Sequence, residues 1–559
     1  MKQGKKYLPF QRVALPDRQW PEKTIEKAPI WCSVDLRDGN QALVNPMGIP
    51  EKLKFFHTLV DCGFKEIEVG FPSASDTEYE ILRMLIEGGH IPDDVTIQVL
   101  VQAREELIRK TFEAVRGAKN VIIHFYNSTS TLQRKIVFRK DMDGIIDIAV
   151  NGARLIRKLT EEEVARSGMH IRYEYSPESF TGTEIDFSIR ICEAVMDEMG
   201  ATKENPIILN LPSTVELSTA NTYADQIEYF CRHIKNRDAC IVSLHPHNDR
   251  GTGVASAELA LMAGAERIEG TLFGNGERTG NLDIVTVALN MFTLGVDPKL
   301  DFSHILDIKK IYEECTQMRV PERQPYAGSL AFTAFSGSHQ DAIRKGFEYM
   351  KDTGSPYWEV PYLPINPADI NREYEPVIRI NSQSGKGGAA FVLDHAVGYH
   401  LPKEMHPEFG AIVKAAADKS GLELTSKQIV ELFNKEYIDV KGRYSLVYHR
   451  FTELHDADGS VHSRFEGMLN IAGENKTIAG VGNGPIDSFF QALEGIGITN
   501  YEFVDYHEHA ISRGSDSLGI CYIELKKRDN GHIFGVGINA NVNVAALQGI
   551  ICAINRAER

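Results

Sequence analysis

The feature that most constrains the fold is a regular alternation of short apolar runs and amphipathic segments that begins near residue 30. Eight runs rich in β-branched and aromatic residues recur, and each is separated from the next by enough chain for a helix. Apolar strands that alternate with amphipathic helices are typical of a parallel sheet. The runs are WCSVDL, FKEIEVG, VTIQVLV, NVIIHFY, HIRYEYS, PIILNLP, CIVSLHP and ERIEGTL.

Eight strand–helix units in about 250 residues predict a closed (β/α)8 TIM barrel, so the fold class is α/β. A doubly wound open sheet is the alternative that the same pattern allows. The barrel hypothesis makes a sharper prediction, because it places catalytic residues at the carboxyl ends of the strands and in the loops that follow them. We expect the catalytic barrel over residues 30–300, preceded by an amino-terminal extension at 1–29.

The alternation is lost after about residue 300. Helical segments and proline-rich connections between 301 and 435 predict mainly helical accessory subdomains. The region 436–559 carries an internal repeat, in which IAGVGNGPIDSFFQAL is similar to IFGVGINANVNVAALQGI and a shared Gly-Val-Gly recurs 55 residues later. Strand candidates precede both copies. We therefore expect a carboxyl-terminal α+β domain built from a duplicated βββα unit, which could serve only for dimerisation or could hold a small ligand between its halves.

Composition limits the classes of partner. The net charge of −16 at pH 7 argues against a nucleic-acid-binding surface and against binding to anionic membranes. No stretch approaches the roughly 20 apolar residues that span a bilayer, and the amino terminus lacks a signal-peptide core. The eight cysteines are scattered without a C-x-x-C pair. We expect a cytoplasmic protein with reduced thiols.

Polar residues follow the predicted strands where the barrel hypothesis requires them. His245 and His247 lie one residue apart, so a strand would project both side chains to the same face. Asp38 follows the first strand, and its carboxylate would converge on the same barrel mouth. Two imidazoles, a carboxylate and a polar side chain from the last loop are typical ligands of a divalent cation that also binds substrate. Taken alone, the two histidines could equally be buried or surface residues that bind nothing.

The other polar residues at the predicted mouth leave alternatives open. Arg37 could form a structural ion pair or stabilise an anionic substrate. Glu178 and Glu277 could orient substrate, take part in proton transfer or pair with an arginine. His124 and Thr214 could donate hydrogen bonds to a substrate carboxylate. The residues alone predict a metal-dependent barrel enzyme that acts on a small oxygenated substrate.

Three long motifs resemble those of the 2-isopropylmalate synthase family: SVDLRDGNQAL, SLHPHNDRGTG and GNGERTGN, which begin at residues 33, 243 and 274. They occur in the family's order, and the resemblance covers essentially the whole chain. It implies a Claisen-type condensation of acetyl-CoA with 3-methyl-2-oxobutanoate, followed by thioester hydrolysis to 2-isopropylmalate and CoA, in leucine biosynthesis. It also implies a divalent metal ion (Mg²⁺, Mn²⁺ or Zn²⁺), activation by a monovalent cation such as K⁺, a homodimer and inhibition by L-leucine.

The resemblance assigns roles residue by residue. His339 and Tyr374 match accessory-region residues that reach a partner subunit's active site, which makes the dimer necessary for catalysis. Gly484 and Pro485 lie in the motif GNGPID, where the family binds leucine. Together with the residues at the mouth, the assignments are metal ligands Asp38, His245, His247 and Asn281; catalytic residues Arg37, Glu178, His339 and Tyr374; substrate-binding residues His124, Thr214 and Glu277; and effector-binding residues Gly484 and Pro485.

Three other kinds of protein remain as alternatives. Sibling synthases for citramalate or homocitrate would use the same machinery on a different 2-oxo acid, and the size of the pocket distinguishes them. A lyase on the same barrel would cleave a carbon–carbon bond, but the full accessory region and effector domain argue against it. A non-catalytic amino-acid sensor would have no reason to keep the metal ligands and Arg37 together.

Overall fold

The computed structural model describes residues 6–374, 388–420, 424–438, 440–456, 458–511, 517–527 and 530–559. The chain divides into two compact units: unit 1 comprises Met1–Phe332 and Leu363–Tyr374, and unit 2 comprises Thr333–Tyr362 and Glu375–Arg559. This division is coarser than the four parts expected from the sequence, whose boundaries stay predictions. Within the described ranges, no helix is long and apolar enough to cross a membrane.

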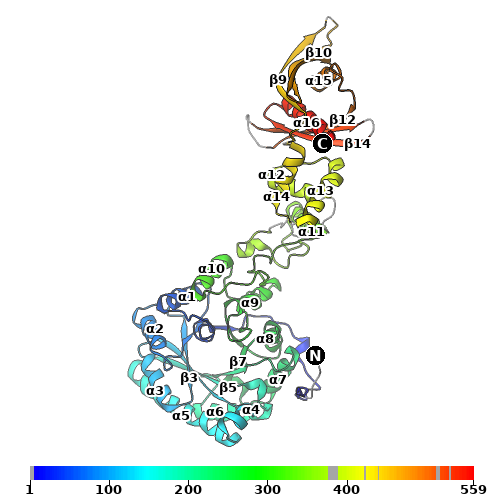
Figure 1. The fold of residues 1–559 in the computed structure, drawn as a ribbon. Helices are drawn as coiled ribbons and strands as arrows, with labels where there is room; N and C mark the ends of the chain where they lie inside the picture. The colour runs from blue at the N-terminus through cyan, green and yellow to red at the C-terminus, as the bar shows by residue number, and fades with distance from the viewer. Residues whose placement is uncertain are drawn as a thin grey trace. The chain divides into compact units, whose positions relative to one another are not determined.

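Unit 1 is a closed barrel of eight strands that pair in parallel and in sequence order, which confirms the TIM-barrel prediction. All eight expected runs contain a strand, and the helices surround them on the outside (Figure 1). The strands are β1 (Ile30–Ser33), β2 (Glu66–Gly70), β3 (Thr96–Gln102), β4 (Asn120–Ser128), β5 (His170–Glu178), β6 (Ile207–Ser213), β7 (Cys240–Pro246) and β8 (Arg267–Gly270). The helices are α1 (Ile49–Asp61), α2 (Asp76–Glu87), α3 (Glu105–Ala114), α4 (Thr131–Gln133), α5 (Met142–Ser167), α6 (Ile185–Met199), α7 (Ala220–His233), α8 (Gly253–Met262), α9 (Ile284–Thr293) and α10 (Ile305–Thr316).

The apolar core of unit 1 lies between the strands and the helices. Ile67 in β2 and Ile97 in β3 are completely buried there. Helix α2 begins where the side chain of Ser75 accepts a hydrogen bond from Glu78 N, and it turns Leu82 and Leu85 inward. Each such apolar side chain contributes about 1.5–3 kcal/mol when it is buried. This apolar layer stabilises the closed barrel and offers no groups that could react or bind a metal.

The inside of the barrel is polar instead. Glu68, Gln98, Glu174, Arg267 and Glu269 come from β2, β3, β5 and β8, and none of them exposes any surface. Barrels are usually filled by branched apolar side chains, so a charged interior requires another source of stability. Here that source is a network of hydrogen bonds and ion pairs that links the strands across the barrel.

Two details at the strand ends differ from the expectation. Strand β1 ends at Ser33, and Asp35–Gly39 form a π-helical turn in place of further strand. Asp35 supports this turn because its carboxylate accepts hydrogen bonds from Ser33 Oγ (2.8 Å) and Leu272 N (3.1 Å). His124, expected among the polar residues at the mouth, lies in the middle of β4, where its backbone pairs with that of Glu174 on β5. It is therefore further inside the barrel than the loops of the mouth.

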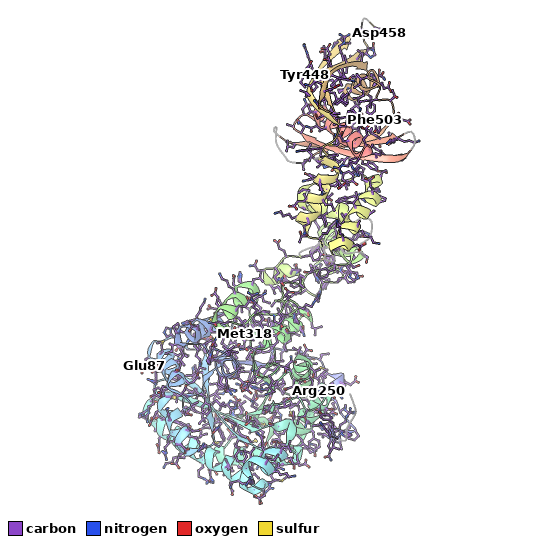
Figure 2. The ribbon with its side chains drawn as sticks, viewed as in Figure 1. Glu87, Arg250, Met318, Tyr448, Asp458 and Phe503 are labelled. Atoms are coloured by element: carbon purple, nitrogen blue, oxygen red, sulfur yellow. The ribbon has the colours of Figure 1, made fainter. Side chains whose placement is uncertain are left out.

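Unit 2 contains the accessory helices and the duplicated domain. The helices are α11 (Gly337–Thr353), α12 (Gly388–Val397), α13 (His406–Ser420) and α14 (Ser426–Phe433). Two three-stranded antiparallel sheets follow, each completed by a helix, as the repeat predicted. The copies are β9 (Tyr444–His455), β10 (Val461–Ile471), β11 (Glu474–Gly482) and α15 (Pro485–Glu494), then β12 (Tyr501–Ala510), β13 (Gly519–Lys527), β14 (Asn530–Asn539) and α16 (Val542–Ala557). Figure 2 labels Tyr448 on β9, Asp458 in the β9–β10 turn and Phe503 on β12.

The repeated Gly-Val-Gly has a packing reason. A Cβ atom on Gly480 would meet the backbone of α15 at Ser488 O, and one on Gly535 would meet the backbone of α16 at Gly549 O. The two strands can therefore lie directly against their helices only because these positions lack side chains. The same constraint acts in both copies, which explains why this part of the repeat is recognisable in the sequence.

Candidate active site

A cavity of about 400 Å³ opens at the mouth of the barrel. Its wall combines charged groups with apolar side chains such as Phe71, Leu100 and Pro212. The carboxyl ends of barrel strands are the usual position of an active site, and a mixed wall of this kind suits a small oxygenated ligand with an apolar part. The cavity brings together eight of the predicted site residues: Arg37, Asp38, His124, Glu178, Thr214, His245, His247 and Glu277.

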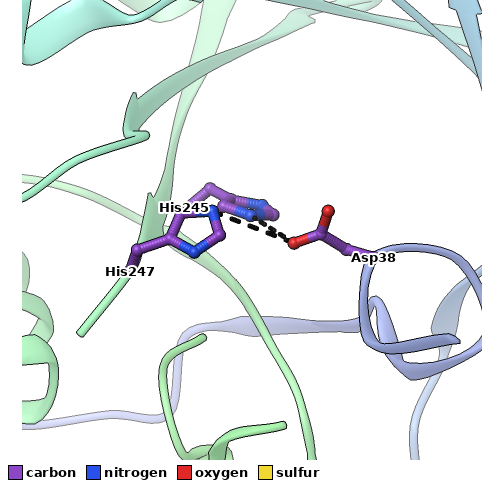
Figure 3. Close-up of side chains that lie close together, drawn as sticks. All are labelled: Asp38, His245 and His247. Carbon is purple, nitrogen blue, oxygen red and sulfur yellow. Dashed lines mark ion pairs between the residues drawn. The ribbon is translucent and has the colours of Figure 1, made fainter. Parts of the chain in front are cut away.

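Asp38, His245 and His247 form a compact, buried cluster at this mouth (Figure 3). Asp38 Oδ2 lies 3.4 Å from His245 Nε2 and 3.9 Å from His247 Nε2. His245 Nδ1 lies 2.8 Å from Glu269 Oε2, so it donates to that carboxylate and leaves Nε2 directed at Asp38. One atom from each of the three residues lies within 4.8 Å of the others, a separation at which a single cation can contact all of them.

The chemistry of these donors fits a divalent cation. Asp38 Oδ2 and His247 Nδ1 are buried and make no hydrogen bond within the described residues. Burial would raise the pKa of Asp38, but the charge of Arg37 and the imidazole of His245 hold this pKa well below its usual value. Burial and the nearby His245 lower the pKa of His247 to about 4, so that ring is neutral at pH 7. A carboxylate and a neutral imidazole are the forms that ligate metals. Burial would lower the pKa of His245, but the Asp38 and Glu269 carboxylates raise it to about 9, so this ring would release a proton when a cation binds.

Asn281, the fourth expected ligand, lies beside this cluster. Its backbone forms a bridge with His247, and its Nδ2 donates to Asn275 O (3.1 Å), which leaves Oδ1 buried without a hydrogen bond among the described residues. The loop that carries it turns sharply at Gly280, whose φ of 102° is one that L side chains rarely adopt. Asn281 lines an adjoining cavity of about 510 Å³ and not the 400 Å³ cavity itself.

Arg37 is held between two carboxylates. Its Nη1 lies 2.5 Å from Asp38 Oδ1, and its Nε donates to Glu68 Oε1. Both ion pairs are largely desolvated, since only 11% of the Arg37 side chain is exposed. The guanidinium is thus a fixed positive charge in the wall of the cavity, whichever of its two expected roles it performs.

His124 makes hydrogen bonds with both ring nitrogens. Nδ1 lies 2.7 Å from Glu68 Oε2, and Nε2 lies 2.7 Å from Ser176 Oγ. A carboxylate can only accept, so Nδ1 donates to Glu68, and Nε2 forms the hydrogen bond with Ser176. A direct hydrogen bond from His124 to a substrate would have to replace one of these two contacts.

The remaining mouth residues differ in their freedom to bind. Thr214 Oγ1 is buried without a hydrogen bond within the described ranges, so it is available to a ligand. Burial raises the pKa of Glu178, whose carboxylate accepts from Ser128 Oγ at 3.3 Å. Glu277 accepts from Gln41 Nε2 at 3.1 Å in a more exposed position. Arg278 pairs with Asp249 at 2.6 Å and joins the loops that follow two strands.

The other predicted residues are not among those that line this cavity. His339 belongs to unit 2, where its ring stacks on Tyr362 with centroids 4.1 Å apart. Tyr374 ends the second segment of unit 1 and is not among the residues that line the cavity. In unit 2, Gly484 and Pro485 line a separate cavity of about 470 Å³, which also includes Val542 at the start of α16. The two halves of the repeat thus share one pocket.

The structure adds buried residues that were not predicted. Two of the predicted site residues, His124 and His245, form hydrogen bonds with Glu68 and Glu269 in the barrel interior. Gln98 donates to both of these carboxylates, and Arg267 donates to Glu269 at 2.9 Å. A signal for them is present in the sequence, because polar side chains recur at alternate positions inside strands that are otherwise apolar, as in FKEIEVG and ERIEGTL. In a barrel, one of the two alternating sets points to the interior.

Comparison with known proteins assigns families to all three regions. The family described as HMGL-like matches residues 28–311, "Alpha-isopropylmalate synthase, post-catalytic domain-like" matches 329–394, and "LeuA allosteric (dimerisation) domain" matches 423–558. The 2-isopropylmalate synthase of Clostridium acetobutylicum is 53% identical over 554 residues, which cover 99% of each chain. That of Rhodospirillum rubrum is 54% identical over 555 residues, or 99% of this chain and 98% of the relative. The chain therefore belongs to the 2-isopropylmalate synthase family, enzymes of acyltransferase type whose barrel is HMGL-like.

Proposed function

We propose that the chain condenses acetyl-CoA with 3-methyl-2-oxobutanoate and hydrolyses the resulting thioester, releasing 2-isopropylmalate and CoA in leucine biosynthesis. The observation that carries this proposal is the cluster of Asp38, His245 and His247 in a barrel-mouth cavity that also contains Arg37. Full-length relatives named for this activity support it. The cavity of about 400 Å³ is of a size for a small 2-oxo acid, and its apolar wall would receive the isopropyl group.

A divalent cation, Mg²⁺, Mn²⁺ or Zn²⁺, would be held by Asp38, His245, His247 and Asn281. When bound, it supplies Lewis-acid polarisation of the 2-oxo group and the adjacent carboxylate. The donor set is oxygen and imidazole without thiolate, which suits all three metals. The buried oxygens of Asp38 and Asn281 that lack hydrogen bonds support this assignment.

The chain's own residues would then bind and orient the reactants. Arg37 would stabilise negative charge on the enolate or ketone oxygen, because its guanidinium is already fixed by two carboxylates. Thr214 Oγ1 would donate to the substrate carboxylate, and His124 and Glu277 would border the bound acid. Glu178 would face the branched end, and burial at that position raises the pKa of its carboxyl group. His339 and Tyr374 would complete the pocket from a second copy of the chain.

L-leucine would act as inhibitor at the cavity of about 470 Å³ in unit 2. Ile486, Phe490 and Phe503 offer an apolar wall for its side chain, and the carboxylate of Glu508 faces the same space for its ammonium group. The amino-terminal ends of α15 and α16 both border this cavity and favour a carboxylate. The family description of this region as allosteric and dimerising supports both the effector and a homodimer.

The test is CoA release from acetyl-CoA, followed with a thiol reagent, against a panel of 2-oxo acids with Mg²⁺, Mn²⁺ or Zn²⁺, with and without K⁺ and leucine. We expect release with 3-methyl-2-oxobutanoate, suppressed by leucine, and a loss of about 10³-fold in His245→Ala. His170→Ala is the matched control, because His170 is an exposed histidine at the other end of the barrel.

Each other outcome has a distinct meaning. A preference for pyruvate or 2-oxoglutarate would keep the chemistry and replace the substrate. Release that leucine does not change would refute the effector role of unit 2. No release with any acid under all three metals would refute the synthase proposal.

A further inference from the structure

A second cluster of metal-ligating type lies beneath the first. One atom each of Glu68, His124 and Glu269 lies within 4.8 Å of the others, and all three side chains are buried. The centre of this cluster is already occupied by the side-chain amide of Gln98. Its Nε2 lies 2.8 Å from Glu68 Oε2, 2.8 Å from Glu269 Oε1 and 3.3 Å from His124 Nδ1. An uncharged N–H₂ group therefore stands where a cation could otherwise bind.

The orientation of this amide is set by its other end. Gln98 Oε1 accepts a hydrogen bond from Arg267 Nη2 at 2.8 Å, and a guanidinium can only donate. The carbonyl oxygen therefore faces Arg267, and the two N–H bonds face the two carboxylates. Since Gln98 is 0% exposed, water is not available to replace any of these contacts.

The two carboxylates that Gln98 joins each support a residue of the proposed metal centre. Glu269 Oε2 accepts from His245 Nδ1 at 2.8 Å, which directs His245 Nε2 at the cation position. Glu68 Oε1 accepts from Arg37 Nε, and Arg37 in turn binds Asp38 at 2.5 Å. The amide of Gln98 therefore contacts both the carboxylate that orients His245 and the carboxylate that binds Arg37.

We propose that Gln98 is a positioning residue of the metal centre, whose amide holds the Glu68 and Glu269 carboxylates in the arrangement that directs His245 and Arg37. Gln98 contacts neither substrate nor cation in this role. The inference rests on the proposed function in one respect, that the cluster of Asp38, His245 and His247 binds a divalent cation. Residues that orient metal ligands typically change metal affinity 10–100-fold when they are replaced.

The experiment measures Mn²⁺ binding to the full-length, chelator-treated protein from the electron paramagnetic resonance signal of free Mn²⁺. In Gln98→Met, which removes the hydrogen bonds and keeps a similar volume, we expect the dissociation constant to rise about 10–100-fold. Gln226→Met is the matched control: Gln226 is also a buried glutamine, but it lies on α7 outside the barrel interior. We expect a change of less than about 3-fold there.

A spectroscopic measurement separates positioning from stability. With Co²⁺ bound, the visible absorption spectrum reports the ligand geometry, so Gln98→Met should change its band positions or intensities while circular dichroism shows a folded protein. Gln98→Glu is the second variant, because it keeps the side-chain shape, replaces an N–H donor by an oxygen and places a further carboxylate beside Glu68 and Glu269. We expect it to weaken Mn²⁺ binding more than Gln98→Met.

The outcomes distinguish this inference from the proposed function. If Asp38→Asn abolishes Mn²⁺ binding while folded Gln98 variants keep the wild-type affinity and Co²⁺ spectrum, the positioning role is refuted and the metal centre stands. If Asp38→Asn and the wild type bind Mn²⁺ equally, the metal centre is refuted and the role of Gln98 falls with it.

Discussion

Replacing Arg267 by methionine tests whether the stability of the polar barrel interior depends on the positive charge of this one arginine. The Arg267 guanidinium binds Glu66 Oε2 at 2.6 Å, Ser243 Oγ and Gln98 Oε1 at 2.8 Å, and Glu269 Oε1 at 2.9 Å. Methionine is of similar length but brings no charge and no donors. Glu174 Oε2 also lies 3.2 Å from the Arg267 guanidinium, so the variant removes this counter-charge from three buried carboxyl groups.

The expected cost follows from these contacts. Removing one partner of a buried ion pair costs about 3–5 kcal/mol, because the remaining charge is left uncompensated. Unit 1 has about 340 residues, so its unfolding entropy near the midpoint is about 0.7 kcal/mol/K, and the melting temperature of this unit should fall by about 4–7 °C. Burial would raise the pKa of Glu66, but Arg267 and Arg172 keep it lowered. In Arg267→Met the pKa of Glu66 rises, so the folded state binds more protons than the wild type does. The loss in free energy of unfolding should therefore become smaller as the pH falls from about 7 to 5.

Differential scanning calorimetry of the full chain measures this shift at both pH values. Arg172→Met is the control, because Arg172 also pairs with Glu66 at 2.6 Å but keeps 21% of its side chain exposed. Its loss should cost about 1 kcal/mol or less, which lowers the melting temperature by at most about 1.5 °C. An Arg267→Met protein that melts within about 1 °C of the wild type at pH 7 would show that the interior network does not depend on this ion-pair cluster.

Three further predictions concern pH, metal and effector. Burial raises the pKa of Asp35 to about 7, so between its usual pKa of 3.8 and that value the folded state holds a proton that the unfolded chain releases. The free energy of unfolding should therefore fall by up to about 4 kcal/mol as the pH rises through this window. Urea unfolding at several pH values should show this dependence in the wild type and not in Asp35→Asn. The same pH dependence in both proteins would contradict a raised pKa at Asp35. Mn²⁺ at about 100 times its dissociation constant should raise the melting temperature of unit 1 by about 4 °C in the wild type, and chelation or His247→Ala should abolish the increase. Phe490→Ala should raise the leucine concentration for half-inhibition by about 10-fold or more, because it removes part of the apolar wall of the unit 2 cavity. Phe292→Ala, on the exposed side of α9, should leave that concentration unchanged. Equal inhibition curves for the Phe490→Ala variant and the wild type would contradict this effector site.

The barrel and the duplicated domain could be predicted because their signals are local. A strand such as β7 appears as a short apolar run, and a helix such as α2 shows its buried face within a few turns. The repeat could be recognised because Gly480 and Gly535 meet the same steric requirement in both copies. The π-helical turn at Asp35–Gly39 had no such signal, since Asp35 stabilises it through Leu272 N, more than 200 residues away.

The convergence of the mouth residues followed from the barrel hypothesis, but their supporting contacts did not. Gln98 and Glu269 are 171 residues apart, and only closure of the barrel brings them to 2.8 Å. In the sequence, Gln98 is an isolated amide in the run VTIQVLV, whereas Glu269 alternates with Arg267 in ERIEGTL, and neither pattern by itself shows which face of the strand points inward. Which alternating set points inward depends on the register of all eight strands, and that is a property of the closed sheet.

Residue type alone would also have predicted a second metal site inside the barrel. Glu68, His124 and Glu269 satisfy the same ligand chemistry and the same 4.8 Å spacing as Asp38, His245 and His247. The two clusters differ in what lies between the ligand atoms. At the mouth, Asp38 Oδ2 accepts no hydrogen bond among the described residues, whereas in the deeper cluster the amide of Gln98 satisfies both carboxylates. The amide of Gln98 thus satisfies the deeper cluster, whereas the upper cluster keeps a buried oxygen with no hydrogen bond among the described residues and is compatible with a divalent cation. We therefore expect a substitution at Gln98 to alter the site although Gln98 is not itself one of the proposed ligands.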